Sequence, residues 1–331
     1  MFGSKKVPVG LAGCGYWGRN LARNLHQMGH LAAVCDPSAK ILKDVKAAYK
    51  GVRTCSKIED LLGDAKIKAV AIAAPAAQHY DVAKKALLAG KDVFVEKPLA
   101  LRVPEAEELV ELAARKKRIL MIGHILEYHP AIQKLKDFVD SGELGDIHYI
   151  YSNRLNLGKV RQEENILWSF APHDISVILL LTGAMPVWAS TNGESYLQHD
   201  VADVTMTSLA FPGKARAHIF VSWLHPFKEQ KLVVIGSRKM AVFDDVVKEG
   251  KLKIFDKGIE WKNGQPVTRQ TAESTLFFPE TEPLREELAH FVDCVRSRKR
   301  PRTDGENGLR VLRVLDACQR SVESNGQPVK V

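Results

Sequence analysis

The chain has 331 residues, a formal net charge of +9 and 45% hydrophobic residues. This length exceeds the size at which a single hydrophobic core stops growing, so we expect two domains. The sequence contains no run of about eighteen uncharged apolar residues and no signal-peptide core at its N-terminus, so we expect a soluble, cytoplasmic protein. The five cysteines form no C-x-x-C pair, which argues against a metal site or a disulfide framework.

Two basic runs, at residues 115–118 and 296–302, raise the question of nucleic acid binding. Both lie at the ends of segments with helical spacing, where cations complement the helix dipole. Neither run contains the interleaved aromatic residues that stack on bases. We therefore expect solvated helix ends and no nucleic acid partner. The excess of positive charge suits an anionic small-molecule substrate.

The first expected element is a buried strand at residues 7–12, followed by Gly13, Gly15 and Gly18 in the spacing G-x-G-x-x-G. In a dinucleotide-binding turn the first glycine permits the bend, the second lets backbone approach a pyrophosphate, and the third lets helix and strand pack closely. Asp36 follows at a distance where a carboxylate accepts from both ribose hydroxyls of adenosine. Because this carboxylate would repel a 2′-phosphate, we expect NAD rather than NADP.

Apolar strands and helices alternate through the first part of the chain. The helices are expected at 16–28, 37–49, 79–89 and 104–115, and further strands at 31–35, 52–54, 69–73, 92–96 and 119–122. Continuous apolar runs are typical of strands covered on both faces. The pattern predicts an α/β fold in which residues 1–123 form a Rossmann domain with a doubly wound parallel sheet.

Residues 124–331 are expected to form a second, α+β domain that binds substrate. Its strands alternate apolar and polar residues at 147–155, 189–194, 204–211, 215–223, 232–235, 241–244 and 252–255, and its helices are expected at 130–141, 172–181, 283–296 and 305–322. Alternation predicts a large, mostly antiparallel sheet with one open face, and the final helices are free to pack back on the first domain. An open apolar face implies a homo-oligomer, either a dimer or a tetramer.

Three motifs give the chain a family resemblance: Ala74-Pro75-x-x-x-His79, Glu96-Lys97-Pro98 at the end of the fifth strand, and His173-Asp174-Ile175. With the glycine turn, they make the chain resemble the glucose-fructose oxidoreductase, inositol dehydrogenase and rhizopine catabolism (Gfo/Idh/MocA) family of NAD(P)-dependent sugar dehydrogenases. The resemblance covers essentially the whole chain. It implies that Lys97 lies beside the nicotinamide and the substrate hydroxyl, and that His173 accepts the proton.

This assignment agrees with the chemistry. Oxidising a secondary alcohol needs a base near neutral pKa, which histidine provides, and a lysine that stabilises the developing alkoxide. An alternative without a catalytic role stays open for each residue. In that alternative, Lys97 is an ordinary lysine in a loop, and His173 caps the start of its own helix. The residues assigned to the cofactor are Gly13, Gly15, Tyr16, Trp17, Gly18, Asp36, Pro75, His79, Glu96 and Lys97. For His79 the alternative is a histidine at a helix N-terminus.

One residue departs from the family pattern. Many relatives carry an aspartate four residues before the histidine, where this chain has Ser169. No carboxylate at that position orients His173, and Asp174 is the nearest substitute, although the next residue on a helix points elsewhere. This leaves open how Lys97 and His173 divide the work. No grouping of residues has metal-ligand spacing, so no metal is expected.

The second domain is similar to the branch of the family that acts on UDP-linked N-acetylhexosamines, on the residues 153–158, 161, 165–168, 223–228 and 234–237. That branch oxidises C3 of the sugar to a ketone, which a partner aminotransferase converts to a 3-amino sugar, a precursor of lipopolysaccharide. The candidate substrate-binding residues are Tyr128, Arg154, Asn156, Arg161, Asp174 and Lys228. The cations among them suit a diphosphate; otherwise they are exposed charges at a sheet edge, and Tyr128 belongs to a packed aromatic cluster.

The leading prediction is that the protein oxidises UDP-N-acetylglucosamine at C3. Two alternatives within the same class are a UDP-N-acetylglucosaminuronate 3-dehydrogenase and a dehydrogenase of free inositol or hexose, which would not need the extra cations. The alternative from another class is a non-catalytic NAD-binding regulatory protein. The presence of Lys97 and His173 argues against a regulatory protein, whereas Ser169 in place of the aspartate argues for one.

Overall fold

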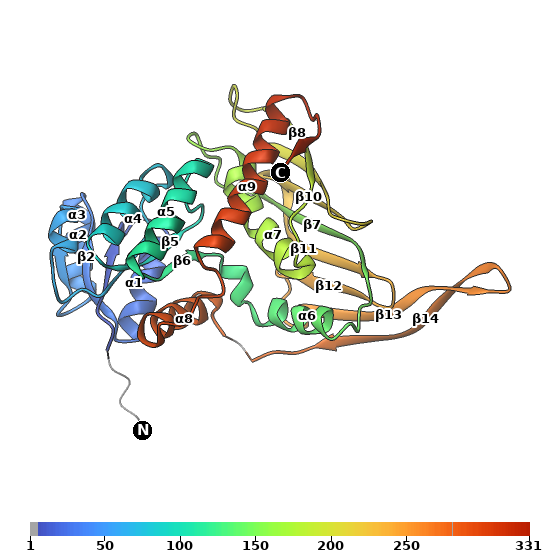
Figure 1. Ribbon diagram of the computed structural model, residues 1–331, viewed down its shortest axis with the longest axis horizontal. Helices are drawn as coiled ribbons and strands as arrows, with labels where there is room; N and C mark the ends of the chain where they lie inside the picture. The colour runs from blue at the N-terminus through green and yellow to red at the C-terminus, as the bar shows by residue number, and fades with distance from the viewer. Residues whose placement is uncertain (1–5, 280) are drawn as a thin grey trace. The chain divides into compact units, whose positions relative to one another are not determined.

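The computed structural model describes residues 6–279 and 281–331. The chain divides into two compact units, many of whose elements are labelled in Figure 1. One unit comprises Met1–Ile125 and Glu282–Leu312, and the other comprises Leu126–Thr281 and Arg313–Val331. No helix among the described residues is long and apolar enough to cross a membrane.

A parallel sheet forms the centre of the first unit. Its strands in the described residues are β1 (Val9–Ala12), β2 (Leu31–Cys35), β3 (Arg53–Cys55), β4 (Ala69–Ile72), β5 (Asp92–Glu96) and β6 (Leu120–Gly123). They lie in the order β3-β2-β1-β4-β5-β6, with every pairing parallel. Residues of β1 and β4 are fully buried. The predicted doubly wound parallel sheet is confirmed, and its order reverses between β1 and β4, where such sheets bind ligands.

Helices connect these strands, and one later helix, α8 (Pro283–Ser297), also belongs to this unit. The connecting helices are α1 (Gly18–Gln27), α2 (Ala39–Ala48), α3 (Ile58–Leu62), η1 (Ala76–Gln78), α4 (His79–Leu88) and α5 (Val103–Lys116). The short α3 was not predicted, because five residues give too little periodicity. Its Leu61 packs against β1 where a Cβ on Gly10 would come within 2.8 Å. α8 is joined to the sheet by Arg298, which donates two hydrogen bonds of 2.7 and 3.0 Å to the buried Asp92.

A mostly antiparallel sheet forms the second unit and confirms the predicted α+β architecture. Its strands are β7 (Ile147–Leu157), β8 (Trp188–Glu194), β9 (Val204–Ala210), β10 (Arg216–Ser222), β11 (Leu224–Gly236), β12 (Met240–Asp244), β13 (Leu252–Lys262), β14 (Gln265–Leu276) and β15 (Val329–Lys330). In the described residues their order is β14-β13-β12-β11-β7-β10-β9-β8-β15, and β7 and β10 are parallel neighbours. The helical elements are η2 (Ile125–Tyr128), α6 (Pro130–Asp140), α7 (Ile166–Thr182) and α9 (Gly305–Glu323), which is shared with the first unit. α7 packs on β7, β9 and β10.

Two elements differ from the sequence expectation. α7 begins at Ile166 rather than at residue 172, because the Asn165 side chain caps it by accepting from the Trp168 N–H at 3.2 Å, and Pro172 lies inside the helix. β13 and β14 form a long hairpin that extends beyond the other strands (Figure 1), where only residues 252–255 were expected. Most of its residues are exposed, so it lacks the one-sided apolar alternation that marks a half-buried strand.

Candidate active site

The glycine turn between β1 and α1 has the geometry of a phosphate-binding loop. Gly13 has φ +86°, and a Cβ there would lie 2.7 Å from the backbone nitrogen of Ala74. A Cβ on Gly18 would overlap the carbonyl oxygen of Gly13, so only glycine lets α1 start this close to the turn. A Cβ on Gly15, by contrast, would meet no atom of the described residues within 4 Å. The turn is therefore packed on its inner side and open at Gly15, as a ligand that approaches the backbone requires.

Asp36 ties the end of β2 to this turn. Its Oδ2 accepts from the Cys14 N–H at 2.8 Å, and its Oδ1 accepts from the Ser38 N–H at 2.9 Å. These backbone donors fix the carboxylate, which is 6% exposed, where adenosine ribose hydroxyls bind in this fold. Burial, and next the Asp36 charge, raise the pKa of the Cys14 thiol to about 11, so the turn contains a neutral thiol rather than a thiolate that would repel phosphate.

The Glu96 carboxylate connects the glycine turn to the end of β5. The Trp17 indole donates a 2.6 Å hydrogen bond to Glu96 Oε1. In the register of β5 and β6, Glu96 pairs with Gly123, where a Cβ would lie 2.9 Å from Glu96 Oε2. A side chain in place of Gly123 would have to displace the carboxylate from its present position. Burial raises the pKa of Glu96 to about 7, against the opposing effects of the Trp17 hydrogen bond and the Lys97 charge.

His79 joins the loop after β4 to the loop after β5. Its Nδ1 lies 2.7 Å from the carbonyl oxygen of Pro98, and its Nε2 lies 2.9 Å from the carbonyl oxygen of Ala74. The ring is 2% exposed. Although His79 is at the first position of α4, its side chain fixes two loops rather than capping the helix. Pro75 lies in the first of these loops, next to Ala74, and Tyr16 is 92% exposed on the glycine turn.

Sequence reasoning overlooked His124. It follows Gly123 at the end of β6 and is 1% exposed, and neither ring nitrogen has a hydrogen-bond partner among the described residues. Burial, and next the Lys97 charge, lower its pKa to about 3, so the ring is neutral at physiological pH. Its position at the carboxyl end of a strand, next to the strand that carries Lys97, was a signal available in the sequence.

His173 lies inside α7 and not at the start of a helix. Its carbonyl oxygen accepts from the Ser176 hydroxyl at 3.0 Å, and Ser169 precedes it by one turn on the same helix face. The alternative in which His173 caps the start of its own helix is therefore wrong. An aspartate in place of Ser169 would lie on the His173 side of the helix, which explains how a carboxylate there could orient the ring.

Asp174 does not replace that carboxylate. Arg154 donates from Nε to Oδ2 at 2.8 Å and from Nη2 to Oδ1 at 3.1 Å, and the Ser152 hydroxyl donates to Oδ1 at 2.6 Å. Asp174 is 2% exposed, and both of its oxygens are used in binding β7. The expectation that Asp174 substitutes for the missing aspartate is wrong, because its carboxylate faces the sheet rather than His173.

The remaining substrate candidates have different surroundings in the second unit. Asn156 lies two residues beyond Arg154 on the same face of β7, and its Oδ1 is buried without a hydrogen-bond partner among the described residues. Arg161 is ion-paired with Glu164 at 3.0 Å. Lys228 lies in β11, next to Glu229, which pairs with Leu155. Tyr128 is 5% exposed, in η2.

Gly15→Ala is expected to separate folding from cofactor binding. The added methyl group meets no atom of residues 6–279 or 281–331 within 4 Å, so thermal unfolding should match that of the unsubstituted protein. NAD affinity, by contrast, should fall by about tenfold or more because the backbone can no longer approach the pyrophosphate. Calorimetric titration with NAD and thermal unfolding measure the two effects. Gly18→Ala is the matched control and should lower the melting temperature. Unchanged NAD affinity in Gly15→Ala would show that phosphate does not bind there.

Glu96→Gln is expected to be more stable than the unsubstituted protein at alkaline pH. The folded-state pKa of Glu96, about 7, lies above its ordinary value, so the folded state binds more protons than the unfolded state and stability falls as pH rises through this interval. The free energy of unfolding of Glu96→Gln should exceed that of the unsubstituted protein by about 2 kcal/mol at pH 8, and the difference should vanish near pH 4. The value is reduced from the full effect of the pKa shift because Glu96 is partly exposed to solvent. Urea unfolding at both pH values measures it. An equal difference at both pH values would refute the shift.

Comparison with known proteins places these features in a family. Residues 7–124 match the NAD-binding Rossmann domain of the Gfo/Idh/MocA oxidoreductases, and residues 132–242 match the C-terminal domain of the same family. The chain is 28% identical to the UDP-N-acetylglucosamine 3-dehydrogenase of Acidithiobacillus ferrooxidans over 96% of this chain and 97% of that enzyme. It is 24% identical to the myo-inositol 2-dehydrogenase of Thermotoga maritima, covering 95% and 96%.

Solved structures show the same relationship. The A. ferrooxidans enzyme superposes with a TM-score of 0.85 at 27% identity, covering 97% of this chain and 98% of that chain. The WlbA dehydrogenase of Bordetella pertussis, solved with NADH and UDP-GlcNAcA, shares the fold with a TM-score of 0.81 at 21% identity, covering 99% of each chain. The glycine turn and Asp36 lie within the residues that match the NAD-binding Rossmann model of the family. The chain belongs to the Gfo/Idh/MocA oxidoreductase family and is an NAD-dependent dehydrogenase.

Proposed function

We propose that this dehydrogenase oxidises C3 of UDP-N-acetylglucosamine to the 3-keto sugar. The observation that carries the proposal is that the match to the A. ferrooxidans UDP-N-acetylglucosamine 3-dehydrogenase extends over 97% of that enzyme, including the second unit as well as the Rossmann unit. The proposal includes a partner aminotransferase, which would use the 3-keto product and install an amino group at C3.

The proposed reaction needs two groups of the protein at the substrate hydroxyl, a base and a cation. Oxidation breaks the C3–H and O–H bonds of the sugar, and bound NAD supplies the acceptor for the hydride. His173 accepts the hydroxyl proton, because a neutral imidazole is a base at physiological pH. Lys97 stabilises the negative charge that develops on the oxygen. Ser169 cannot supply the negative charge with which an aspartate would stabilise the protonated ring of His173, so removal of the hydroxyl proton depends more on the positive charge of Lys97.

The charges of the second unit support an anionic substrate. Arg154 and Arg161 each have a carboxylate partner within the chain, Asp174 and Glu164 respectively. Lys228 is exposed and has no carboxylate partner among the described residues. An ammonium group without an internal counter-ion is available to a diphosphate. We therefore assign the diphosphate contact to Lys228, and to Arg154 the task of holding Asp174 and thereby the segment of α7 that contains His173.

A substrate panel tests the proposed reaction. Purified protein, in excess over sugar, is mixed with NAD and either UDP-N-acetylglucosamine, its uronate, free N-acetylglucosamine or inositol, and NADH is followed by absorbance in a single turnover. An aminotransferase with an amino donor removes the ketone if the equilibrium is unfavourable. NADH should form with UDP-N-acetylglucosamine, and Lys97→Ala should abolish it while NAD still binds. Formation of NADH with inositol alone would contradict the proposal, and none with any sugar would favour a regulatory protein.

Lys228→Ala is expected to raise KM for the UDP sugar. Loss of one charge-assisted hydrogen bond should cost about 2 kcal/mol, which is roughly a thirtyfold increase, with a smaller effect on kcat. The matched control is Lys231→Ala in the same strand, because Lys231 already has Asp244 as a partner at 3.4 Å. Initial rates with varied UDP-N-acetylglucosamine measure both. Equal KM values in the two variants would remove Lys228 from the diphosphate site.

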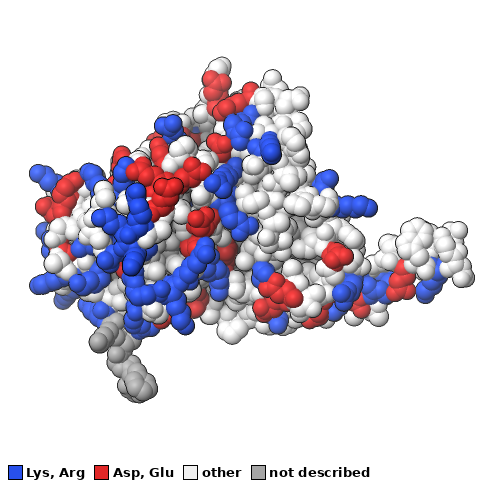
Figure 2. All heavy atoms as spheres, in the orientation of Figure 1, with Lys and Arg blue, Asp and Glu red and all other residues white. Residues whose placement is uncertain are grey.

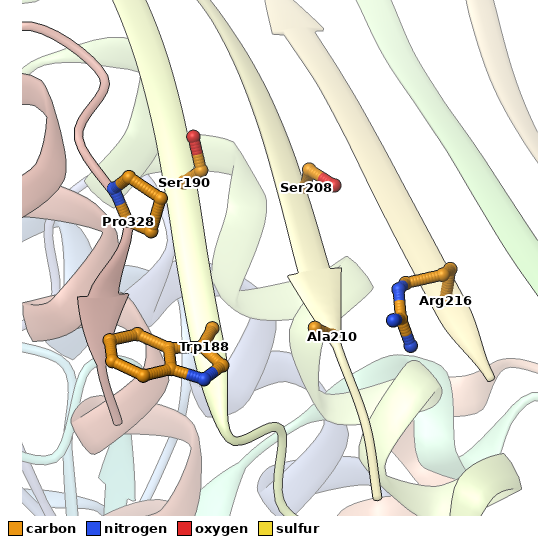
Figure 3. A pocket seen from close by; sticks show the side chains of 6 residues that line it. All are labelled: Trp188, Ser190, Ser208, Ala210, Arg216 and Pro328. Atoms are coloured by element: carbon orange, nitrogen blue, oxygen red, sulfur yellow. The ribbon is translucent and has the colours of Figure 1, made fainter. Parts of the chain in front are cut away.

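We also propose that the chain forms a homo-oligomer through the face of the second-unit sheet opposite α7. Met206 pairs with Phe220 on this face, and Met206 and Trp188 are 58% and 47% exposed. A hollow in the same face is lined by Trp188, Ser190, Ser208, Ala210, Arg216 and Pro328 (Figure 3). Figure 2 shows that the surface over β8 and β10 is largely uncharged in this view. Large exposed apolar side chains grouped on one face, as Trp188 and Met206 are here, are typical of an interface.

Met206→Lys is expected to weaken this assembly, because it buries an unpaired charge in the interface. Light scattering during size-exclusion chromatography should give a dimer or tetramer for the unsubstituted protein and a smaller species for the variant. Leu88→Lys, at an exposed position of α4, is the control and should leave the mass unchanged. A monomer in the unsubstituted protein at micromolar concentration would contradict the proposal.

A further inference from the structure

His124 is a buried polar group for which the described residues supply no hydrogen bond. Both ring nitrogens are almost entirely buried and have no hydrogen-bond partner among the described residues, and the side chain is 1% exposed. Leaving a buried donor and acceptor unsatisfied costs about 1–3 kcal/mol for each group. A phenylalanine of similar shape would avoid this cost. The position therefore needs a reason other than packing.

The fold places His124 in the half of the sheet that is not used for adenosine. In the strand order β3-β2-β1-β4-β5-β6, the glycine turn follows β1 and Asp36 follows β2, which assigns β1–β3 to the adenosine half of a dinucleotide. The other mononucleotide half then belongs to β4–β6. The pair Glu96 and Gly123 is the last in the register of β5 and β6, so Lys97 and His124 are the next residues on these two strands. Both residues lie at the carboxyl edge where the nicotinamide half binds.

The chemistry of the ring indicates what it binds. Burial and the nearby Lys97 lower the pKa of His124 to about 3, so the ring has one N–H donor, one acceptor and no charge. A phosphate or carboxylate would favour a charged ring, which this environment opposes. A carboxamide is uncharged and offers both a carbonyl acceptor and an N–H donor, so it can pair with either ring nitrogen.

We propose that His124 binds the carboxamide of the nicotinamide ring through one of its ring nitrogens and thereby orients the ring beside Lys97. His124 is in this account a positioning residue for the hydride transfer. The water-poor surroundings strengthen this hydrogen bond, because no solvent competes for the ring nitrogen. The inference depends on NAD binding and not on which sugar is oxidised, so it can fail while the proposed substrate holds, and the reverse is equally true.

The test compares two ligands that differ in the nicotinamide. Affinities for NADH and for ADP-ribose, which lacks nicotinamide, are measured by calorimetric titration of the unsubstituted protein and of His124→Phe. The variant should bind NADH about tenfold more weakly and bind ADP-ribose within about twofold of the original affinity. Without ligand it should unfold at the same temperature or a higher one, because two unsatisfied polar atoms are removed. A merely structural role predicts equal effects on the two ligands.

Two further variants complete the design. His124→Asn keeps a donor and an acceptor, so its ratio of NADH to ADP-ribose affinity should be closer to that of the unsubstituted protein than the ratio in His124→Phe. His30→Phe alters a histidine that precedes β2, at the opposite edge of the sheet, and should leave the ratio unchanged. Equal loss of both ligands in His124→Phe, or an unchanged NADH affinity in a folded variant, would overturn the proposal. If His124→Phe does not fold, an unaltered ratio in His124→Ala would overturn it.

Discussion

The parallel pairing of six strands is the constraint on which the candidate site of the first unit depends. Because the strands run in one direction, every loop after a strand reaches the same edge of the sheet. The glycine turn, Asp36, Pro75, Lys97 and His124 come from five separate stretches of sequence, and each follows one strand of this sheet. Contacts between the loops then fix their details. Glu96 bonds to Trp17 of the glycine turn, and His79 bonds to the loops after β4 and β5.

In the second unit, the candidate site depends on a buried ion pair. Arg154 of β7 and Asp174 of α7 are both largely buried, with side chains 11% and 3% exposed, and their two hydrogen bonds join the helix to the sheet next to His173. Removing one partner of such a pair leaves an uncompensated charge inside the protein. The Arg154–Asp174 ion pair therefore holds the segment of α7 that contains His173 without a contribution from the substrate. Arg154, which the sequence offered as a ligand for a diphosphate, is thus occupied by Asp174 inside the protein.

The sequence predicted the first unit well because its signals are local. Apolar strands, the glycine spacing and the E-K-P tripeptide each lie within a few residues, and the sheet followed from their alternation with helices. The start of α7 was missed because Pro172 resembles a helix start, whereas the cap is the more distant Asn165. The β13–β14 hairpin lacks apolar alternation, although Asn263-Gly264, both with positive φ, is a typical hairpin turn. The partners of Asp174 and the isolation of His124 depend on packing between distant segments, which periodicity does not contain.

The central claim is that this chain transfers hydride from C3 of a UDP-linked N-acetylhexosamine to NAD. The most direct measurement uses UDP-N-acetylglucosamine carrying deuterium at C3, with mass spectrometry of the NADH released in a single turnover. The account predicts that the deuterium appears in NADH and that the sugar product is lighter by one deuterium and one proton. NADH without deuterium would show that the hydride comes from another carbon, and the absence of both NADH and a ketone would contradict the assignment of Lys97 and His173 to catalysis.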